Sequence, residues 1–154
     1  MMSTAGQPII TATEFECVTP ILRVSNVGES IAYYVGVLGF KIDWQAGDFA
    51  SVGRDRCHIM LAEGEQGHAG TWVWIGVEDA GRLYEEYKAK GAMIRRPPTS
   101  YEWAYELQVF DPDGHVLRLG SEPRQDEPIG PWLDENGVLW QKQADGSFQK
   151  VEKK

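Results

Sequence analysis

The sequence predicts an α+β fold in which tandem βαβββ modules form a curved mixed sheet with an open concave cleft, followed by a small C-terminal β meander. The first observation is an internal repeat, because the order of strand and helix patterns in residues 18–62 returns in residues 71–119. The second is that one helix per four strands covers only one face of each sheet. The third is a pair of strong hairpin turns near the end of the chain, Asn136-Gly137 and Asp145-Gly146. We therefore expect function on the uncovered sheet faces.

Composition narrows the classes of partner. The 154 residues suit one compact domain or two small fused units, and the formal net charge is -8. This charge argues against a nucleic-acid partner and is compatible with a cationic ligand. Cys17 and Cys57 give neither a disulfide framework nor metal-type spacing. No apolar run approaches the roughly 20 residues that cross a bilayer, and no signal-peptide pattern begins the chain, so we expect a reduced, cytoplasmic protein with no membrane partner.

An N-terminal arm precedes the first module. Residues 1–16 are polar and small, which is typical of a disordered tail, although an arm that docks on a partner subunit also fits. In the first module, residues 17–66, Asn26 with Glu29 three residues later forms a capping box that begins an amphipathic helix. Gly39 ends that helix. The strands expected in this module are residues 18–24, 40–44, 49–53 and 56–62.

The pattern restarts in the second module, residues 67–122. Asp79 is the expected N-cap of its helix, and Gly91 ends it. Pro97-Pro98 is expected to forbid continuation of the strand before it. The sequence Asp111-Pro112-Asp113-Gly114 predicts a tight turn that closes a hairpin beside the cleft. The strands expected in this module are residues 71–77, 92–95, 101–110 and 115–119.

The last segment, residues 123–154, differs in composition. It begins with a proline-rich linker and continues with short apolar runs separated by the two hairpin turns. We expect a small meander that covers exposed apolar surface of its own chain or of a partner.

The tandem repeat, the helix end Val37-Leu38-Gly39-Phe40 and the Asp-Pro-Asp-Gly turn together resemble the vicinal oxygen chelate superfamily over about residues 18–122. That superfamily holds glyoxalase I, extradiol dioxygenases, fosfomycin-resistance enzymes and bleomycin-resistance proteins. Within the superfamily, the sequence motifs most resemble those of the bleomycin-resistance proteins, although the tail after residue 122 is longer than expected for that group. The segments that carry this likeness are Gly39-Phe40, Asp43-Trp44, residues 48–52, residues 71–75, Glu102-Trp103 and Glu106.

The resemblance implies four positions where the superfamily's enzymes hold a divalent metal. In this chain they carry Thr19, Met60, Trp72 and Arg118, none of which is a good ligand for such a metal. The prediction therefore leans against an enzyme, with no metal, no cofactor and no catalytic residue. His58 and His115 leave a metal pair open, but a polar strand residue and a solvated turn residue are the favoured interpretations.

Aromatic side chains take the place of metal ligands in the expected cleft. Trp72 and Trp74 are two residues apart and share one face of a strand. Flat rings stack on planar or cationic groups, and Glu102 and Glu106 are placed to pair with an ammonium or guanidinium. The alternative is that half of the aromatics are ordinary core. The candidate ligand-binding residues are Trp44, Phe49, Trp72, Trp74, Trp103, Tyr105, Glu102, Glu106 and Arg118.

The favoured function is a metal-independent, antibiotic-resistance-type binding protein. The resemblance implies a homodimer that sequesters an aromatic, cationic, bleomycin-like small molecule in an aromatic cleft between its subunits. A dimer would also cover the exposed sheet faces. The alternatives are a divergent metal-dependent lyase, isomerase or dioxygenase, and a dimerisation scaffold that has lost its ligand.

Overall fold

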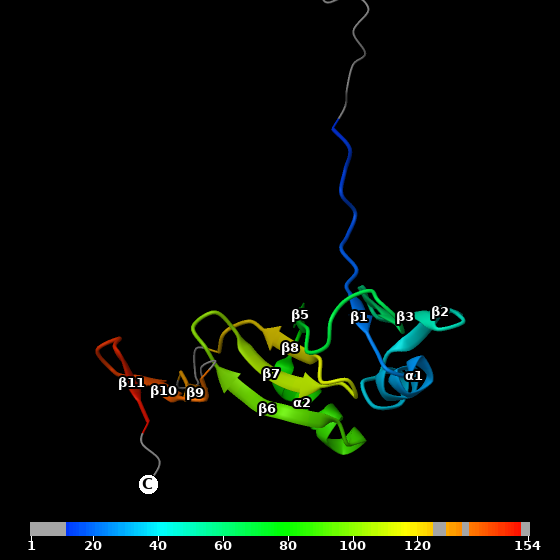
Figure 1. Cartoon of the computed structure of the whole chain (residues 1–154). Coiled ribbons are helices and arrows are strands. Elements are labelled where there is room, and N and C mark those ends of the chain that lie inside the picture. Colours follow the sequence, from blue (N-terminus) through cyan, green and yellow to red (C-terminus); the bar gives the residue numbers. More distant parts are fainter. Residues whose placement is uncertain (1–11, 125–128, 134–135, 152–154) are drawn as a thin grey trace, which may run out of the picture.

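Two helices and two four-stranded sheets form the main body of the chain, as shown in a computed structural model that describes residues 12–124, 129–133 and 136–151 (Figure 1). Each half follows the predicted order β-α-β-β-β, so the expected α+β fold of tandem modules is confirmed. The first module comprises β1 (Ile21–Arg23), α1 (Val27–Gly36), β2 (Lys41–Ala46), β3 (Phe49–Arg54) and β4 (Cys57–Ala62). The second comprises β5 (Trp72–Gly76), α2 (Ala80–Lys90), β6 (Met93–Ser100), β7 (Tyr105–Phe110) and β8 (Val116–Ser121).

The two sheets have the same topology. The first runs β1-β4-β3-β2 and the second β5-β8-β7-β6, and in both the first and last strands of the module pair in parallel. Both helices begin where the sequence predicts, because the Asn26 side chain accepts a hydrogen bond from Glu29 N and Asp79 accepts one from Arg82 N. Each helix covers one face of its sheet, and the alternate strand residues beneath it form a common core.

Strand β6 extends further than expected. The prediction that Pro97-Pro98 ends it near Arg95 is wrong, because it continues to Ser100. β6 is an edge strand, and its pairing with β7 is irregular between Ile94 and Arg96 and again between Arg96 and Thr99. An edge position with bulges tolerates prolines, since their missing N–H groups need not join a ladder.

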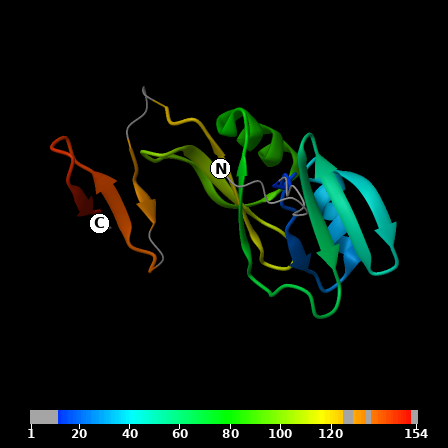
Figure 2. The ribbon, with the colours of Figure 1, turned by 90° about the horizontal axis from the view of Figure 1, so that it is seen from above.

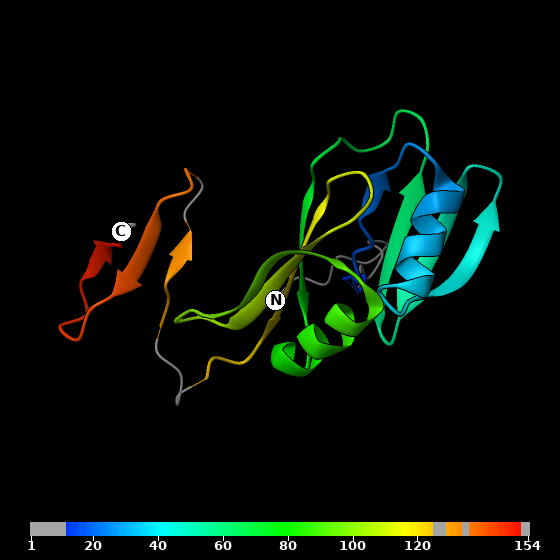
Figure 3. The ribbon, with the colours of Figure 1, turned by 90° about the horizontal axis from the view of Figure 1, so that it is seen from below.

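The modules pack against each other through the turn that begins at Asp111. Tyr34 of α1 donates a hydrogen bond from its hydroxyl to Asp111 Oδ2 at 3.0 Å, and Tyr87 of α2 donates one to Leu38 O at 2.9 Å. His115, expected to be solvated, is instead completely buried. Its Nδ1 accepts from Thr71 N, and its Nε2 lies 2.6 Å from Arg23 O, so this histidine joins the modules. Figure 3 shows the turn beside α1 and β1.

The predicted C-terminal meander is also present. It comprises β9 (Trp132–Leu133), β10 (Leu139–Lys142) and β11 (Phe148–Lys150), which pair antiparallel. The meander lies beyond the β6–β7 hairpin, at the end of the molecule away from the first module (Figure 2). Its links to the body include Gly130 N to Ser100 O at 2.8 Å and a contact of Lys142 with Glu102. In the described parts of the chain, neither helix is long and apolar enough to cross a membrane.

Candidate ligand-binding face

The uncovered face of the second sheet carries the two tryptophans predicted to share a side of one strand. Trp72 is 49% exposed and Trp74 is 54% exposed, whereas Val73 and Ile75, which alternate with them on β5, pack into the core. We call this surface, on the side of β5, β8, β7 and β6 away from α2, the open face of the second sheet. Exposed tryptophans two residues apart on a rigid strand are unusual without a partner or ligand.

Trp74 lies flat on this face because two glycines make room for it. A Cβ on Gly120 would lie 2.9 Å from Trp74 Cζ2, and a Cβ on Gly76 would lie 3.3 Å from Trp74 Cζ3. Gly76 and Gly120 are paired neighbours on β5 and β8. One side of the indole therefore rests on bare backbone, and a large part of the ring remains open to a second flat molecule.

Glu106 fixes the edge of the same indole. It is 1% exposed, and its Oε2 accepts a hydrogen bond from Trp74 Nε1 at 2.9 Å. Its Oε1 accepts from Arg118 Nη2, which forms an ion pair across β7 and β8. The expectation that Glu106 is free to pair with a ligand cation is wrong, because the carboxylate is buried and already paired with Trp74 and Arg118. The ring of Trp74 is thus held in place by contacts within the chain itself.

A second arginine covers part of Trp72. The Arg95 guanidinium lies 4.8 Å from the Trp72 ring centroid and 5.9 Å from that of Phe110. Its Nη1 donates a hydrogen bond to Gln108 Oε1, which orients it over the sheet. Arg95 is a member of the site that sequence reasoning missed, because the bulge in β6 decides which face its side chain takes.

The open face of the first sheet carries a separate aromatic pair. Trp44, 41% exposed, stacks on Phe49 with ring centroids 5.3 Å apart and planes inclined by 24°. Both were predicted ligand contacts, but they lie on a different sheet from Trp72 and Trp74. The chain therefore carries two aromatic patches on two sheets.

His58 occupies the open face of the first sheet, as its spacing from Met60 predicts. Its Nδ1 lies 2.8 Å from Asp43 Oδ2, which also accepts from Ser51 Oγ at 2.9 Å. These hydrogen bonds, that of His58 first, hold the pKa of Asp43 below its usual range. The imidazole lies against Gly53, where a Cβ would meet it at 2.5 Å. His58 is thus a positioned polar strand residue.

The remaining predicted residues lie elsewhere. Trp103 is 59% exposed and stacks on Tyr101 at 4.8 Å, near the start of β7. Glu102 is exposed and pairs with Lys142 of the meander. Tyr105 packs with the core on the helix-covered side of the sheet, under the Arg124 guanidinium at 4.3 Å. The structure therefore does not bring Tyr105 to the face that carries Trp74 and Arg118.

The residues at the superfamily's metal positions do not fit a divalent cation. Of the four, Thr19 offers a neutral hydroxyl, Met60 a thioether, Trp72 an indole that faces Arg95, and Arg118 a guanidinium paired with Glu106. Within the described ranges, no three side chains of His, Cys, Asp or Glu form a group that could hold a metal ion.

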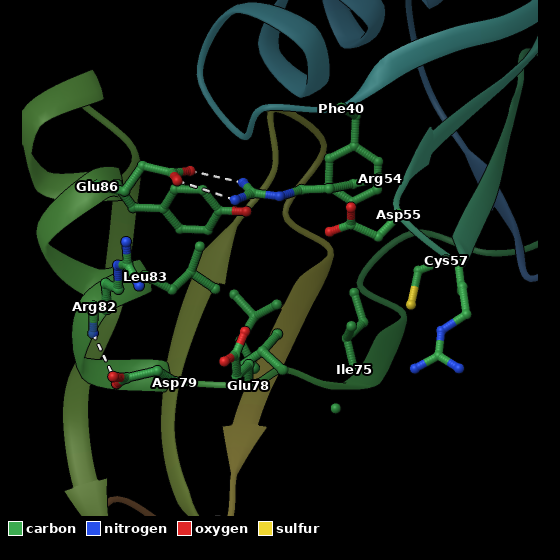
Figure 4. A pocket seen from close by; sticks show the side chains of 15 residues that line it. Phe40, Arg54, Asp55, Cys57, Ile75, Glu78, Asp79, Arg82, Leu83 and Glu86 are labelled. Carbon is green, nitrogen blue, oxygen red and sulfur yellow. Dashed lines mark hydrogen bonds and ion pairs between the residues drawn. The ribbon is translucent and has the colours of Figure 1, made fainter.

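A cavity of about 600 Å³ lies between the modules and contains none of the predicted site residues (Figure 4). Its lining includes the apolar side chains of Ile75 and Leu119 and charged side chains of both signs. The Arg54 guanidinium spans it, with Nη1 and Nη2 donating to Glu86 at 2.7 and 3.0 Å. This bidentate ion pair connects the β3–β4 hairpin of the first module to α2 of the second, on the two sides of the cavity.

Two glycines are further members of the site that sequence reasoning missed. Gly76 and Gly120 each fall within a predicted or observed strand, and an isolated glycine there is a signal of close approach by another group. The sequence does not say which group approaches, because that depends on the register of β5 against β8.

The repeated βαβββ module, with one helix and one uncovered sheet face per half, defines the class of protein. A family model described as the Glyoxalase/Bleomycin resistance protein/Dioxygenase superfamily matches residues 15–119. This match spans more than half of the chain, so the protein belongs to that superfamily, and the predicted resemblance is confirmed. A comparison with curated protein sequences gave no match.

Solved structures show the same fold. The bleomycin-binding protein of Streptomyces verticillus, complexed with copper(II)-bleomycin, is 25% identical, and the match covers 71% of this chain and 98% of that one with a TM-score of 0.63. A glyoxalase/bleomycin resistance protein/dioxygenase from Nocardioides is 17% identical over 79% and 92% of the chains, with a TM-score of 0.61. TioX from Micromonospora sp. ML1 is 19% identical over 70% and 99%, also with a TM-score of 0.61.

Proposed function

We propose that this protein binds an aromatic small molecule without a metal ion and without altering it. The observation that carries the proposal is the geometry of Trp74, whose indole lies on Gly76 and Gly120 and is anchored by Glu106. A ring fixed in this way presents a flat surface at little further entropic cost, and stacking on it contributes about 0.5–1.5 kcal/mol beyond the buried area. Trp72 and Arg118 would extend the contact.

The proposal includes a homodimer. Both sheets leave one face uncovered, and exposed apolar side chains of the described chain include Trp44, Trp72 and Trp74. In the described segment before β1, Phe15 of the N-terminal arm and Val18, which was expected to begin the first strand, are 92% and 91% exposed. Apolar surface of this kind is typical of a protein–protein or ligand interface, and a two-fold dimer would cover the same patch on both subunits. The N-terminal arm would then dock on the partner.

The residues on which the predicted positive charge of the ligand rested no longer support that prediction. The expectation of a cation rested on Glu102 and Glu106, and both carboxylates are paired within the chain, to Lys142 and Arg118. The proposal therefore keeps the aromatic ring and does not include the positive charge.

An antibiotic-like ligand is the specific form of the proposal, and the similarity to a bleomycin-binding protein supports testing it first. Fluorescence titration with metal-free and copper-loaded bleomycin should give saturable quenching at about one ligand per chain. Trp74→Ala should weaken this binding about tenfold or more, and Trp140→Ala in the meander, the matched control, should not.

Three results would contradict the proposal in whole or in part. Stoichiometric zinc, nickel, manganese or iron in protein purified without chelator would favour the alternative of a metal-dependent enzyme. Absence of any thermal shift across a broad panel of planar ligands, bleomycin included, would favour a scaffold without a ligand. Light scattering that gives the monomer mass at micromolar concentration would remove the dimer from the proposal.

A further inference from the structure

We propose that the ligand's aromatic ring carries an anionic group such as a carboxylate, and that Arg118 and Arg95 bind this group beside Trp74. This inference rests on the proposed function, since it names the class of ligand that the open face of the second sheet would take. It reverses the cationic group expected from the sequence, so a cationic, bleomycin-like molecule would bind through its aromatic ring alone and more weakly than an anionic ring compound.

The argument begins with the order of residues across the sheet. Trp74 on β5 pairs with Arg118 on β8, which pairs with Gln108 on β7. Gln108 in turn accepts a hydrogen bond from Arg95 on β6. The stacking ring and two guanidinium groups therefore lie along a row that crosses all four strands.

The balance of charge along this row is positive. Arg95 lies over Trp72, and Arg118 pairs with Glu106, so both guanidinium groups face the row. Among the residues that the structure describes, Glu106 is the acidic side chain paired with an arginine of the row. The two guanidinium groups of Arg95 and Arg118 beside this one carboxylate leave a net positive charge, which attracts an anion and repels an ammonium group.

The carboxylate of Glu106 has little left to offer a ligand cation. It is 1% exposed and already accepts hydrogen bonds from Trp74 and Arg118. A cation approaching from solvent would meet Arg95, which is exposed, and Arg118, whose side chain is 31% exposed, before it met Glu106. Glu106 therefore acts on the two side chains that would touch the ligand and does not itself make the contact.

Arg118 retains unused hydrogen-bonding capacity. A guanidinium has five N–H donors, and the bond to Glu106 uses Nη2. Its Nε–H is buried and has no hydrogen-bond partner in the part of the chain that the structure describes. A buried donor without an acceptor is rare in folded proteins. The Nε–H itself is closed to solvent, so a ligand carboxylate beside the Trp74 ring would bind the accessible part of the guanidinium, whose side chain is 31% exposed.

The Arg95 side chain is also restricted to one orientation. Three contacts restrict this otherwise flexible side chain. The guanidinium lies 4.8 Å from the Trp72 ring centroid and 5.9 Å from that of Phe110, and it donates a hydrogen bond to Gln108. An oriented guanidinium loses less entropy when it binds an anion. The pair of arginines would therefore hold an anionic substituent while Trp74 stacks on the ring.

The test is isothermal titration calorimetry with three probes that share one ring: naphthoate, naphthylmethanol and naphthylmethylammonium. We expect naphthoate to bind about tenfold more tightly than the neutral alcohol, and the ammonium to bind most weakly. Salt should weaken the binding of naphthoate and leave the alcohol unchanged.

Variants assign the preference to these residues. The double variant Glu106→Gln with Arg118→Gln removes both charges of the buried pair together, and Arg95→Gln leaves that pair intact. Each should reduce the preference for naphthoate over the alcohol severalfold, whereas Arg56→Gln, an exposed arginine in the other module, should not. Thermal unfolding of each variant confirms that it is folded at the temperature of the titration.

The outcomes separate this inference from the proposed function. Equal binding of all three probes, tightest binding of the ammonium, or an unchanged preference in both variants would overturn the anion site and leave an aromatic binder standing. No binding of any probe, with no binding of bleomycin, would overturn both.

Discussion

Trp74 lies across Gly120 so closely that a Cβ on Gly120 would lie 2.9 Å from the Cζ2 atom of the indole. Because real Cβ atoms essentially never approach another heavy atom this closely, Gly120→Ala must displace the ring. We expect this variant to bind planar ligands about tenfold more weakly, with a shift in tryptophan emission. Gly36→Ala is the matched control, since nothing lies within 4 Å of a Cβ at that position. Unchanged affinity and emission in Gly120→Ala would contradict the stacking platform.

The buried carboxylate of Glu106 gives a second prediction. Arg118→Ala removes its cationic partner and leaves a negative charge that is 1% exposed, so the free energy of unfolding should fall by about 2–4 kcal/mol. Replacing both residues, Glu106→Gln with Arg118→Gln, should cost less than Arg118→Ala alone, because no buried charge remains. Urea unfolding measures both values. A double variant less stable than Arg118→Ala would show that the pair itself stabilises the fold.

The segment before β1, with Phe15 of the N-terminal arm and Val18 of the first module, provides a third prediction, which tests the proposed dimer. Phe15 and Val18 are 92% and 91% exposed, and a side chain of this size buried in an interface contributes about 1.5–3 kcal/mol. Replacing both by serine should therefore raise the dimer dissociation constant at least tenfold, as measured by light scattering over a range of concentrations. Val35→Ser, at a position 37% exposed on α1, is the control. Equal dissociation constants for all three proteins would show that the arm does not dock.

Local signals explain why the sequence predicts the modules well. Asn26 and Asp79 cap their helices through their side chains, and Gly91 ends α2 with a positive φ of 77°. Each of these depends on residues within one turn of the chain. The repeat then predicts that both halves share one topology, and the exposed positions of Trp72 and Trp74 follow from the two-residue period of β5.

Residues that depend on contacts between strands or modules were not predictable in the same way. The two-residue period of its strand predicts that Glu106 lies on an accessible face, but Arg118 and Trp74 from neighbouring strands cover it. His115 follows a polar turn, yet Arg23 and Thr71 bury it between modules. β6 continues through Pro97-Pro98 because it is an edge strand. The order of strands in a sheet cannot be predicted from residues that are close together in the sequence.

Two buried tyrosines at the junction between the modules give the last prediction. Burial raises the pKa of Tyr87 to about 12, and burial followed by the charge of Asp111 raises the pKa of Tyr34 well above 10. Above pH 10 these residues ionise in the unfolded chain before they ionise in the folded one. The stability they contribute is complete below pH 10 and is lost as the pH rises from 10 toward 12, by roughly 1.4 kcal/mol per pH unit for each group.

Tyr87→Phe isolates one of these groups. At pH 8 the variant should be less stable by about 1 kcal/mol, because the hydrogen bond from the hydroxyl to Leu38 O is lost. Between pH 10 and 11 its stability should fall less steeply than that of the unmodified protein, since one ionising group is absent. Urea unfolding at pH 8, 9, 10 and 11 measures both effects, with Tyr84→Phe on the same helix as the control. Parallel curves for Tyr87→Phe and the unmodified protein above pH 10 would show that Tyr87 ionises equally in the folded and unfolded chain, and the burial of its hydroxyl against Leu38 would then not govern alkaline unfolding.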